Sequence, residues 1–250
     1  MRAVIKHVSV MILLAAFFPC AASSAPAGEP PAEIRIGKAP PPAPRPDPAT
    51  LRAIERFMAA RQSASIDRSR ETAARRWLTG AAKVDAATLA GGPGQRLVAF
   101  DFNDSSVERL DGGRFRVSVY VLFADRQGRV AESRDELLTF TGGSGGFVCA
   151  SLKKTSVMHW DSEEAMKSAA RLQSRDALER ADEFLKSWAQ QQTRLGAYSI
   201  EGVYPAGSGR IMIPCLKFTA EPGKRGYDVV DSPIIMRRGP RGYQIEPPAN

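Results

Sequence analysis

Histidine and cysteine are scarce in this chain of 250 residues. There are two histidines, His7 and His159, and three cysteines, Cys20, Cys149 and Cys215. Serine- and cysteine-type catalysis needs a base beside the nucleophile, and ten residues of extended strand would separate Cys149 from His159 by about 30 Å. Structural zinc sites need several closely spaced Cys or His ligands. We therefore expect neither a catalytic triad nor a metal site.

Two other motifs of cofactor and ion binding are incomplete. Asp101, Asn103 and Asp104 begin like a calcium loop, but the glycine and the distal glutamate that such a loop requires are missing. The glycine-rich run at 142–146 has no Walker lysine and joins two apolar strands, which predicts a hairpin turn instead of a phosphate cradle. No cofactor is expected.

Carboxylates are the acid–base groups that remain. Asp101 lies in the apolar run 98–102, and Asp135 and Glu136 precede an apolar pair. A carboxylate inside a pocket can have a raised pKa and act as a base. A carboxylate on the polar side of a strand would only face solvent, and this is the favoured interpretation for all three. Asp101 is kept as the candidate catalytic residue.

The N-terminus has the pattern of a secretory signal peptide over residues 1–25. Arg2 and Lys6 precede an apolar run at 8–18, and small residues follow. A membrane span needs about 20 residues, so we expect cleavage, a periplasmic or secreted location and no transmembrane span after processing. An uncleaved anchor and a lipoprotein acylated at Cys20 are the alternatives.

Proline is concentrated in residues 26–48, which hold nine of the 18 prolines of the chain. Such a segment favours extended polyproline geometry and cannot bury enough apolar surface to fold. It is therefore predicted to be a semi-rigid spacer. The net charge of +8 is spread along the sequence without a stripe of basic and aromatic residues, so no nucleic-acid partner is expected.

Helical periodicity appears in two regions, each of which precedes a set of strands. Asp47 or Thr50 can cap the first helix, and Asp161 or Ser162 can cap the later one. The predicted helical segments are 51–58, 66–82, 86–89 and 161–192, the last of them divided near residues 174–176.

Apolar alternation with period two predicts two sets of antiparallel strands joined by glycine-rich turns. The strongest alternation covers 115–123. Pro214 and Pro233 have no N–H to donate, so their strands should lie at an edge, bulge or be interrupted there. The predicted strands are 97–102, 115–123, 129–140 and 147–160 in the first set, and 198–204, 210–219, 227–237 and 243–246 in the second.

The two strand sets match when the chain is shifted by 96 residues. Eight of the 41 positions from 107 to 147 are identical to their counterparts, where ordinary composition gives roughly two or three. Duplication is one explanation, and the demand of hairpin turns for glycine at positive φ is the other. Either way, the sequence predicts an α+β fold with helices packed on antiparallel meanders, in two tandem helix-then-sheet units at 49–160 and 161–250.

The order of elements over residues 50–160 resembles the nuclear transport factor two-like group, also called SnoaL-like, and the wider cystatin-like class. The resemblance rests on the helix at 51–58, Trp77 and the strand at 115–123, with a shorter echo over 176–246. It implies a cone with a pocket at its open end. Members include small-molecule isomerases and dehydratases as well as non-catalytic scaffold and secretion-system modules. The family's catalytic Asp–His pairs have no counterpart here.

Cys149 and Cys215 both lie in strand-like apolar runs beyond the leader. An oxidising compartment permits a disulfide between them. Buried free thiols, which behave as small apolar groups, are the alternative.

The missing catalytic constellation favours a non-catalytic exported module that binds a protein partner or a small ligand in the cell envelope. Two other functions stay open. One is a pocket enzyme that uses a buried carboxylate such as Asp101, and the other is an inhibitor or immunity-type protein that acts by occlusion.

Overall fold

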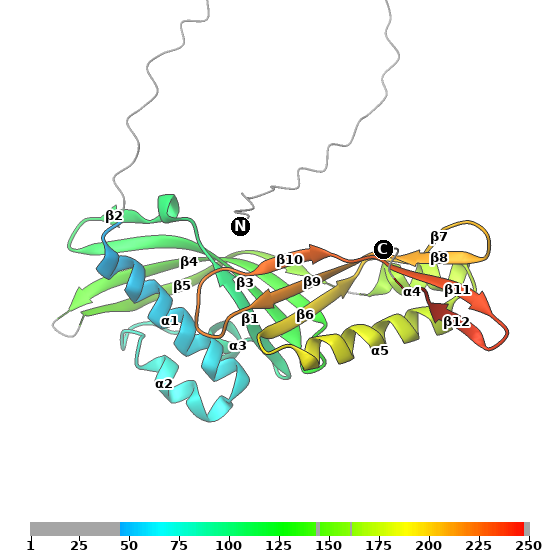
Figure 1. The fold of residues 1–250 in the computed structure, drawn as a ribbon. Helices are drawn as coiled ribbons and strands as arrows, with labels where there is room; N and C mark the ends of the chain where they lie inside the picture. Colours follow the sequence, from blue (N-terminus) through cyan, green and yellow to red (C-terminus); the bar gives the residue numbers. More distant parts are fainter. Residues whose placement is uncertain (1–45, 144–145, 161, 248–250) are drawn as a thin grey trace, which may run out of the picture. The chain divides into compact units, whose positions relative to one another are not determined.

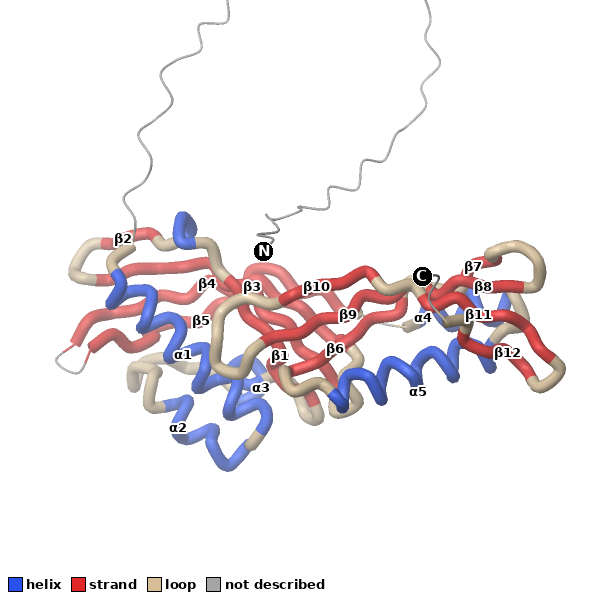
Figure 2. The backbone as a smooth tube through the Cα atoms, in the orientation of Figure 1, coloured by secondary structure: helices blue, strands red, loops and turns tan. Residues whose placement is uncertain are grey.

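The computed structural model describes residues 46–143, 146–160 and 162–247 (Figure 1). The predicted signal peptide and residues 26–45 of the predicted spacer lie outside these ranges. The α+β fold class is confirmed, because helices and antiparallel strands form separate groups along the described chain (Figure 2). None of the helices in the described ranges is both long and apolar enough to cross a bilayer.

Helix α1 (Pro48–Ile66) confirms the first predicted helix, and Asp47 is its N-cap. The Asp47 carboxylate accepts hydrogen bonds from the backbone N–H groups of Ala49 and Thr50, both at 2.9 Å. Pro48 fits the first turn because its missing N–H would have no helical partner there. On the apolar side of α1, Ile54, Phe57 and Met58 are completely buried, and Leu51 is partly buried.

The predicted helix at 66–82 is wrong over most of its length. The chain forms a 3₁₀ turn η1 (Arg68–Arg70) and a short helix α2 (Glu71–Arg75), and then leaves helical geometry. The reason is tertiary, because the backbone at 77–79 pairs with a strand edge. Cys149 donates its N–H to the Trp77 carbonyl at 2.7 Å, and Thr79 donates to the Cys149 carbonyl at 2.9 Å. The extra turn expected at 86–89 is present as α3 (Ala86–Ala90).

The first sheet is the predicted antiparallel meander with one short strand added. Its order is β1-β3-β4-β5, and β2 pairs with β3 after the 3₁₀ turn η2 (Asp104–Ser106). The predicted inward face of β3 is confirmed, because the side chains of Phe115, Val117, Val119, Val121 and Phe123 are all buried. The alternation ends at Leu122, which belongs to the other face and is also buried. The strands are β1 (Gln95–Asp101), β2 (Glu108–Leu110), β3 (Arg114–Asp125), β4 (Val130–Gly143) and β5 (Gly146–His159).

The second region begins with two helices, α4 (Glu163–Arg171) and α5 (Arg175–Gln191), which confirms the predicted break near 174–176. Its strands form two sheets, with orders β10-β9-β6 and β12-β11-β8-β7. The second meander is therefore divided between two sheets. The strands are β6 (Leu195–Ile200), β7 (Tyr204–Pro205), β8 (Arg210–Ile213), β9 (Cys215–Ala220), β10 (Asp228–Asp231), β11 (Ile234–Gly239) and β12 (Gly242–Ile245).

The repeat found in the sequence is present in the strand register. Phe115 faces Phe140 in the first ladder, and Ile211 faces Met236 in the second. Adding 96 to both partners converts the first pair into the second, and the same shift converts Phe123↔Glu132 into Thr219↔Asp228. The hairpin from β3 to β4 and the later hairpin therefore pair in the same way.

The two prolines explain why the second hairpin is split into two sheets. Ser118 and Leu137 face each other in the first ladder, and a shift of 96 places Pro214 and Pro233 at their positions. Two facing prolines supply no N–H between them, so the ladder stops on both strands at the same point. Of the three outcomes predicted at these prolines, which were an edge, a bulge or an interruption, the structure shows the interruption.

Three apolar clusters hold the described elements together. The first lies between α1 and the inner face of the first sheet, and the second lies between α5 and the strands of the second region. The third joins the opposite face of the first sheet to β6 and β9, with Leu122 and Ala124 against Ala197, Phe218 and Ala220. Sequence predicted a boundary between residues 160 and 161, and that boundary stays a prediction.

A glycine turn strengthens the contact made by the third cluster. Gly128, between β3 and β4, accepts a hydrogen bond from the Tyr198 N–H at 2.9 Å. Its φ is +94°, and a Cβ there would lie 2.8 Å from the Cβ of Ala189 on α5. Glycine is therefore required both by the turn and by the close approach of the helix.

Candidate functional site

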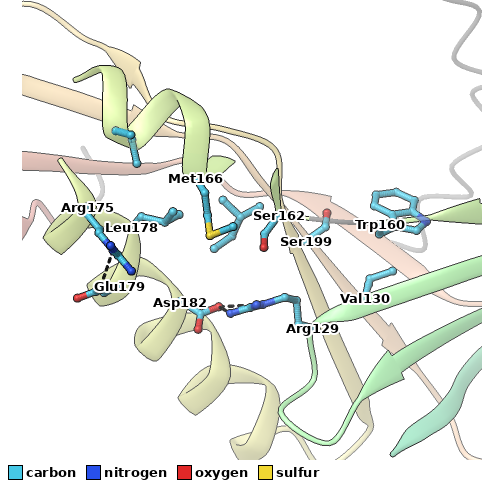
Figure 3. Close-up of a pocket in the computed structure, with 13 residues that line it drawn as sticks. Arg129, Val130, Trp160, Ser162, Met166, Arg175, Leu178, Glu179, Asp182 and Ser199 are labelled. Atoms are coloured by element: carbon cyan, nitrogen blue, oxygen red, sulfur yellow. Dashed lines mark hydrogen bonds and ion pairs between the residues drawn. The ribbon is translucent and has the colours of Figure 1, made fainter. Parts of the chain in front are cut away.

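A cavity of about 400 Å³ lies where the start of β4, the end of β5 and the helices α4 and α5 meet β6 (Figure 3). Cavities that hold small ligands usually measure roughly 300–1,000 Å³ and are mostly apolar. This one has a mainly apolar lining, made by Arg129, Val130, Trp160, Ser162, Met166, Ala169, Ala170, Arg175, Leu178, Glu179, Asp182, Ser199 and Ile200.

The local sequence of the two helices creates the open space. Ala169 and Ala170 contribute only methyl groups from α4. The chain then reverses at Gln173, whose φ is +49°, and α5 begins two residues later. On α5, Leu178 and Asp182 are four residues apart and so share one helix face, which is the face toward the cavity.

An ion pair forms one wall of the cavity. Arg129 Nη2 lies 2.6 Å from Asp182 Oδ1, and the Tyr198 hydroxyl donates to the same oxygen at 2.9 Å. Burial raises the pKa of Tyr198, and the neighbouring Asp182 charge raises it further, so the phenol stays protonated. Burial tends to lower the pKa of Arg129, but the hydrogen bond and charge of Asp182 outweigh it and hold that pKa above its ordinary value.

A second ion pair lies at the mouth of the cavity, where Arg175 Nε is 3.3 Å from Glu179 Oε1 and both side chains are largely exposed. Each cationic residue of the lining is thus paired with a carboxylate of the lining. The cavity is neutral overall, and its remaining polar side-chain groups are the hydroxyls of Ser162 and Ser199 and the indole N–H of Trp160. Such a site can bind an apolar molecule, but it presents no nucleophile beside a base.

Aromatic rings pack in the space between α1 and the first sheet. Phe57, Phe115 and Phe140 pack together there, with ring centroids 4.8 and 5.7 Å apart for the two contacts of Phe140. Beside them Arg61 and Glu136, both with completely buried side chains, form a bidentate ion pair with N–O distances of 2.7 and 3.1 Å.

The guanidinium of Arg61 has all five of its N–H donors engaged. Besides the two bonds to Glu136, it donates to the carbonyls of Leu89 at 2.7 Å and Thr88 at 3.0 Å, and to the Met58 sulfur at 3.3 Å. The two carbonyls lie at the end of α3, where helical carbonyls have no partner within the helix. A buried cation there also complements the helix dipole.

A second arginine extends this network. Arg134 donates to Glu132, approaches Glu136 to 3.8 Å, and donates to the Ala87 carbonyl at 3.2 Å. Burial tends to raise the pKa of Glu132, but the hydrogen bond and charge of Arg134 outweigh it and hold that pKa below its ordinary value. Two arginines and two glutamates therefore neutralise one another beside α1 and α3, and we interpret the network as structural.

The carboxylates singled out in the sequence have three different environments. Asp101, the candidate catalytic residue, is half-buried at the end of β1, accepts the Phe102 N–H at 2.9 Å and does not line the cavity. Asp135 is exposed. The favoured expectation of a solvent-facing carboxylate is wrong for Glu136, because it shares the inward face of β4 with Leu138 and Phe140.

Cys149 and Cys215 are free thiols in different clusters, the first under α1 and the second under α5. The disulfide considered for them is therefore not formed in this structure. Their thiols donate to the carbonyls of Ser151 and Ser232, at 3.2 and 2.6 Å. Burial raises the pKa of Cys149 to about 12 and that of Cys215 to about 11.

The residues of the cavity were not identified from the sequence. Arg129, Trp160, Asp182 and Ser199 come from separate elements, and no spacing rule links them. Only Leu178 and Asp182 could be related from the sequence, because their four-residue spacing places them on one helix face. In the ranges that the structure describes, His, Cys, Asp and Glu side chains form no group suited to hold a metal ion.

Comparison with known proteins leaves the family of the chain open. No protein family and no curated protein matches the sequence. One similar solved structure is described as an "Ntf2 like protein involved in plasmid conjugation"; it is 8% identical, and the match covers 78% of this chain and 92% of that chain with a TM-score of 0.28. A TM-score this low does not establish a shared fold or function, so membership of the nuclear transport factor two-like group stays a prediction.

Proposed function

We propose that the protein is an exported, non-catalytic module of the nuclear transport factor two-like type that binds a small, mainly apolar ligand in the cavity beside β6. The cavity itself is the observation that carries this proposal. It has the volume of a small-molecule site, an apolar lining and ionisable groups that are already paired with one another.

The competing function, a pocket enzyme with a carboxylate base, has less support. Asp101 lies outside the cavity, and Glu136 is held by two guanidinium hydrogen bonds among packed side chains. A general base needs room for a substrate proton within hydrogen-bond reach. An inhibitor that acts by occlusion stays an alternative, although no described feature favours it.

A neutral fluorescent dye such as Nile red tests ligand binding. We expect a blue-shifted, saturable signal with the native protein, because the dye leaves water for an apolar cavity. Ala170→Trp fills the cavity from α4 and should weaken binding at least about tenfold, since a bulky side chain in the site excludes the probe.

Ala73→Trp is the matched control, because Ala73 is exposed on α2 and does not line the cavity. It should bind the dye as the native protein does. Absence of saturable binding to the native protein would overturn the proposal, and so would equal binding by both variants when circular dichroism shows that they are folded.

The exported location rests on the pattern of residues 1–25 and has its own test. Expression of the full chain in a bacterial host should give a shortened protein in the periplasmic or external fraction. A chain without residues 2–25 should stay in the cytoplasm. Intact mass measurement of the exported protein locates the cleavage site, and a full-length, cell-retained product would contradict export.

A further inference from the structure

A second, smaller cavity lies where the end of α1 and the start of β1 meet the turn between β3 and β4. Its volume is about 160 Å³, which is below the roughly 300–1,000 Å³ of most small-molecule sites. One water molecule occupies roughly 30 Å³ in the liquid, so this cavity has room for one small polar group, such as an oxyanion. It shares no lining residue with the apolar cavity.

Three arginines line the small cavity, and no acidic residue does. Arg68 follows α1, Arg96 lies on β1, and Arg126 lies in the turn after β3. Within the ranges that the structure describes, none of these three side chains forms an ion pair with a carboxylate. The apolar cavity is different, because each of its cations is paired.

Two of the three guanidinium groups are held in place by the backbone. Arg68 Nη2 donates to the carbonyls of Gly91 and Gly92, both at 2.9 Å. Arg96 Nη2 donates to the carbonyl of Gly196, also at 2.9 Å. These hydrogen bonds orient the two groups but leave their charge uncompensated. Less side-chain freedom is therefore lost when a ligand binds, which favours affinity.

The acidic residues next to the lining are engaged elsewhere. Asp125 accepts the backbone N–H groups of Gln127 and Arg129 at 2.8 and 2.9 Å, and Asp67 caps η1. Burial lowers the pKa of Arg96, although the charge of Asp125 acts in the opposite direction. A partly buried cation that lacks a close counterion is stabilised by an anion that enters beside it.

We propose that the small cavity binds a phosphate monoester. Guanidinium groups donate to phosphate oxygens in pairs. A phosphate monoester carries a charge of about −1.5 to −2 at pH 7 and three terminal oxygens, so it matches three cations better than a carboxylate, which has one charge and two oxygens. The site is separate from the apolar cavity, and the proposal does not depend on ligand binding there.

Glycerol 3-phosphate and acetate, titrated separately at constant ionic strength, test the proposal. The measurement is made at pH 8, where a monoester is almost fully dianionic because its second pKa is about 6. Glycerol 3-phosphate should shift the backbone amide signals of Gly94, Gln95 and Arg126 in a saturable way in ¹H–¹⁵N spectra. It should bind at least about fivefold more tightly than acetate, as one additional ion pair provides.

Three variants test the role of the arginines. Arg126→Gln should weaken binding about fivefold without loss of stability, because Arg126 is exposed and has no hydrogen bond to the rest of the described chain. Arg126→Lys keeps the charge but not the planar fork, so its affinity should be intermediate. Arg52→Gln removes the same charge from an exposed position on α1 outside the lining, and should bind as the native protein does.

Vesicles distinguish a soluble ester from a lipid head group, since phosphatidic acid also carries a phosphate monoester. If the head group is the ligand, the native protein should sediment with phosphatidylcholine vesicles that contain phosphatidic acid, and Arg126→Gln should do so less. If glycerol 3-phosphate binds and the vesicles do not, the ligand is soluble.

The proposal fails if neither glycerol 3-phosphate nor these vesicles bind the native protein. Equal weakening by Arg52→Gln and Arg126→Gln, with both variants folded by circular dichroism, would also overturn it, because the attraction would then come from the overall charge. Acetate binding as tight as that of glycerol 3-phosphate would overturn the phosphate class of ligand.

Discussion

At the scale of single residues, the buried ion pair of Arg61 and Glu136 illustrates how a charge is tolerated in an apolar core. Each donor of the guanidinium has an acceptor, and two of these acceptors are carbonyls at the end of α3. Removing one partner would leave the other as an uncompensated buried charge, which costs more than the pair itself contributes.

Arg61→Ala should therefore lower the free energy of unfolding by about 3–5 kcal/mol, the usual cost of breaking a buried pair. Urea denaturation followed by tryptophan fluorescence measures this change. Arg70→Ala is the control, because Arg70 forms an exposed ion pair with Asp67 and such pairs contribute about 0–1 kcal/mol.

The double variant Arg61→Met with Glu136→Leu should recover most of the lost stability, since apolar residues of similar volume often replace a buried pair without net cost. A loss of less than about 1 kcal/mol in Arg61→Ala, within the range of exposed pairs, would contradict the view that Glu136 depends on this partner.

The two buried thiols support a second prediction at this scale. Both pKa values are raised by burial, to about 12 for Cys149 and about 11 for Cys215. The thiolate is the reactive form, so alkylation by iodoacetamide at pH 8 should be slow in the folded protein. It should become fast in urea, where the pKa values return toward 9.0.

Mass spectrometry of the processed chain counts the labels on these two cysteines. The unfolded protein, labelled at the same pH, is the reference for full reaction. Rapid labelling of either thiol in the folded protein would contradict the burial described here, and a peptide that joins Cys149 to Cys215 would show that the oxidised protein adopts a different arrangement.

At the scale of elements, strand β4 combines an apolar end with a charged end on the same face. Leu138 and Phe140 pack under α1, while Glu132, Arg134 and Glu136 continue that face into the buried network. A strand with inward charges is stable only where helices supply the partners, which here are Arg61 from α1 and the carbonyls of α3.

Acid unfolding tests the charged end of β4. The pKa of Glu132 is lower in the folded protein than its ordinary value of 4.5, so the unfolded chain takes up a proton first as the pH falls. The contribution of ionised Glu132 to the free energy of unfolding is therefore fully present above about pH 4.5. It is lost as the pH falls through the pKa of Glu132 in the folded protein.

Glu132→Gln should be less stable than the native protein at pH 7, and the difference should shrink as the pH falls below 4.5. Urea denaturation at a series of pH values measures it. Glu108→Gln, which removes an exposed partner of Arg116, serves as the control and should follow the native profile closely. A constant difference between Glu132→Gln and the native protein at all pH values would exclude the proposed linkage.

At the scale of the whole described chain, the third apolar cluster links strands that are far apart in sequence. Phe218 of β9 shares this cluster with Leu122, Ala124 and Val130 of the first sheet, and its ring lies edge-on to Trp160 at 6.1 Å. Loss of this ring should therefore weaken both regions together.

Phe218→Ala should reduce the free energy of unfolding by about 3–5 kcal/mol, as buried Phe→Ala changes usually do. Amide hydrogen exchange should become faster in both β3 and β9. Val230→Ala, exposed on β10, is the control and should leave exchange almost unchanged. If Phe218→Ala accelerates exchange only after residue 195, the two regions unfold separately and the cluster does not couple them.

The sequence by itself determined the type and order of most elements, because these follow from neighbours a few residues apart. Alternation fixed the buried face of β3, Asp47 marked the start of α1, and the facing prolines 214 and 233 divided the second hairpin. The shift of 96 residues also anticipated the shared strand register.

Three features were decided only by the tertiary structure. They are the partners of the charged residues, the point where the predicted helix at 66–82 ends, and the cavity. Arg61 and Glu136 are 75 residues apart, and the segment expected as helix at 66–82 pairs instead with β5 at Cys149. Arg129 and Ser199 meet at one cavity through different elements. Such contacts depend on how whole elements pack, so no local pattern could specify them.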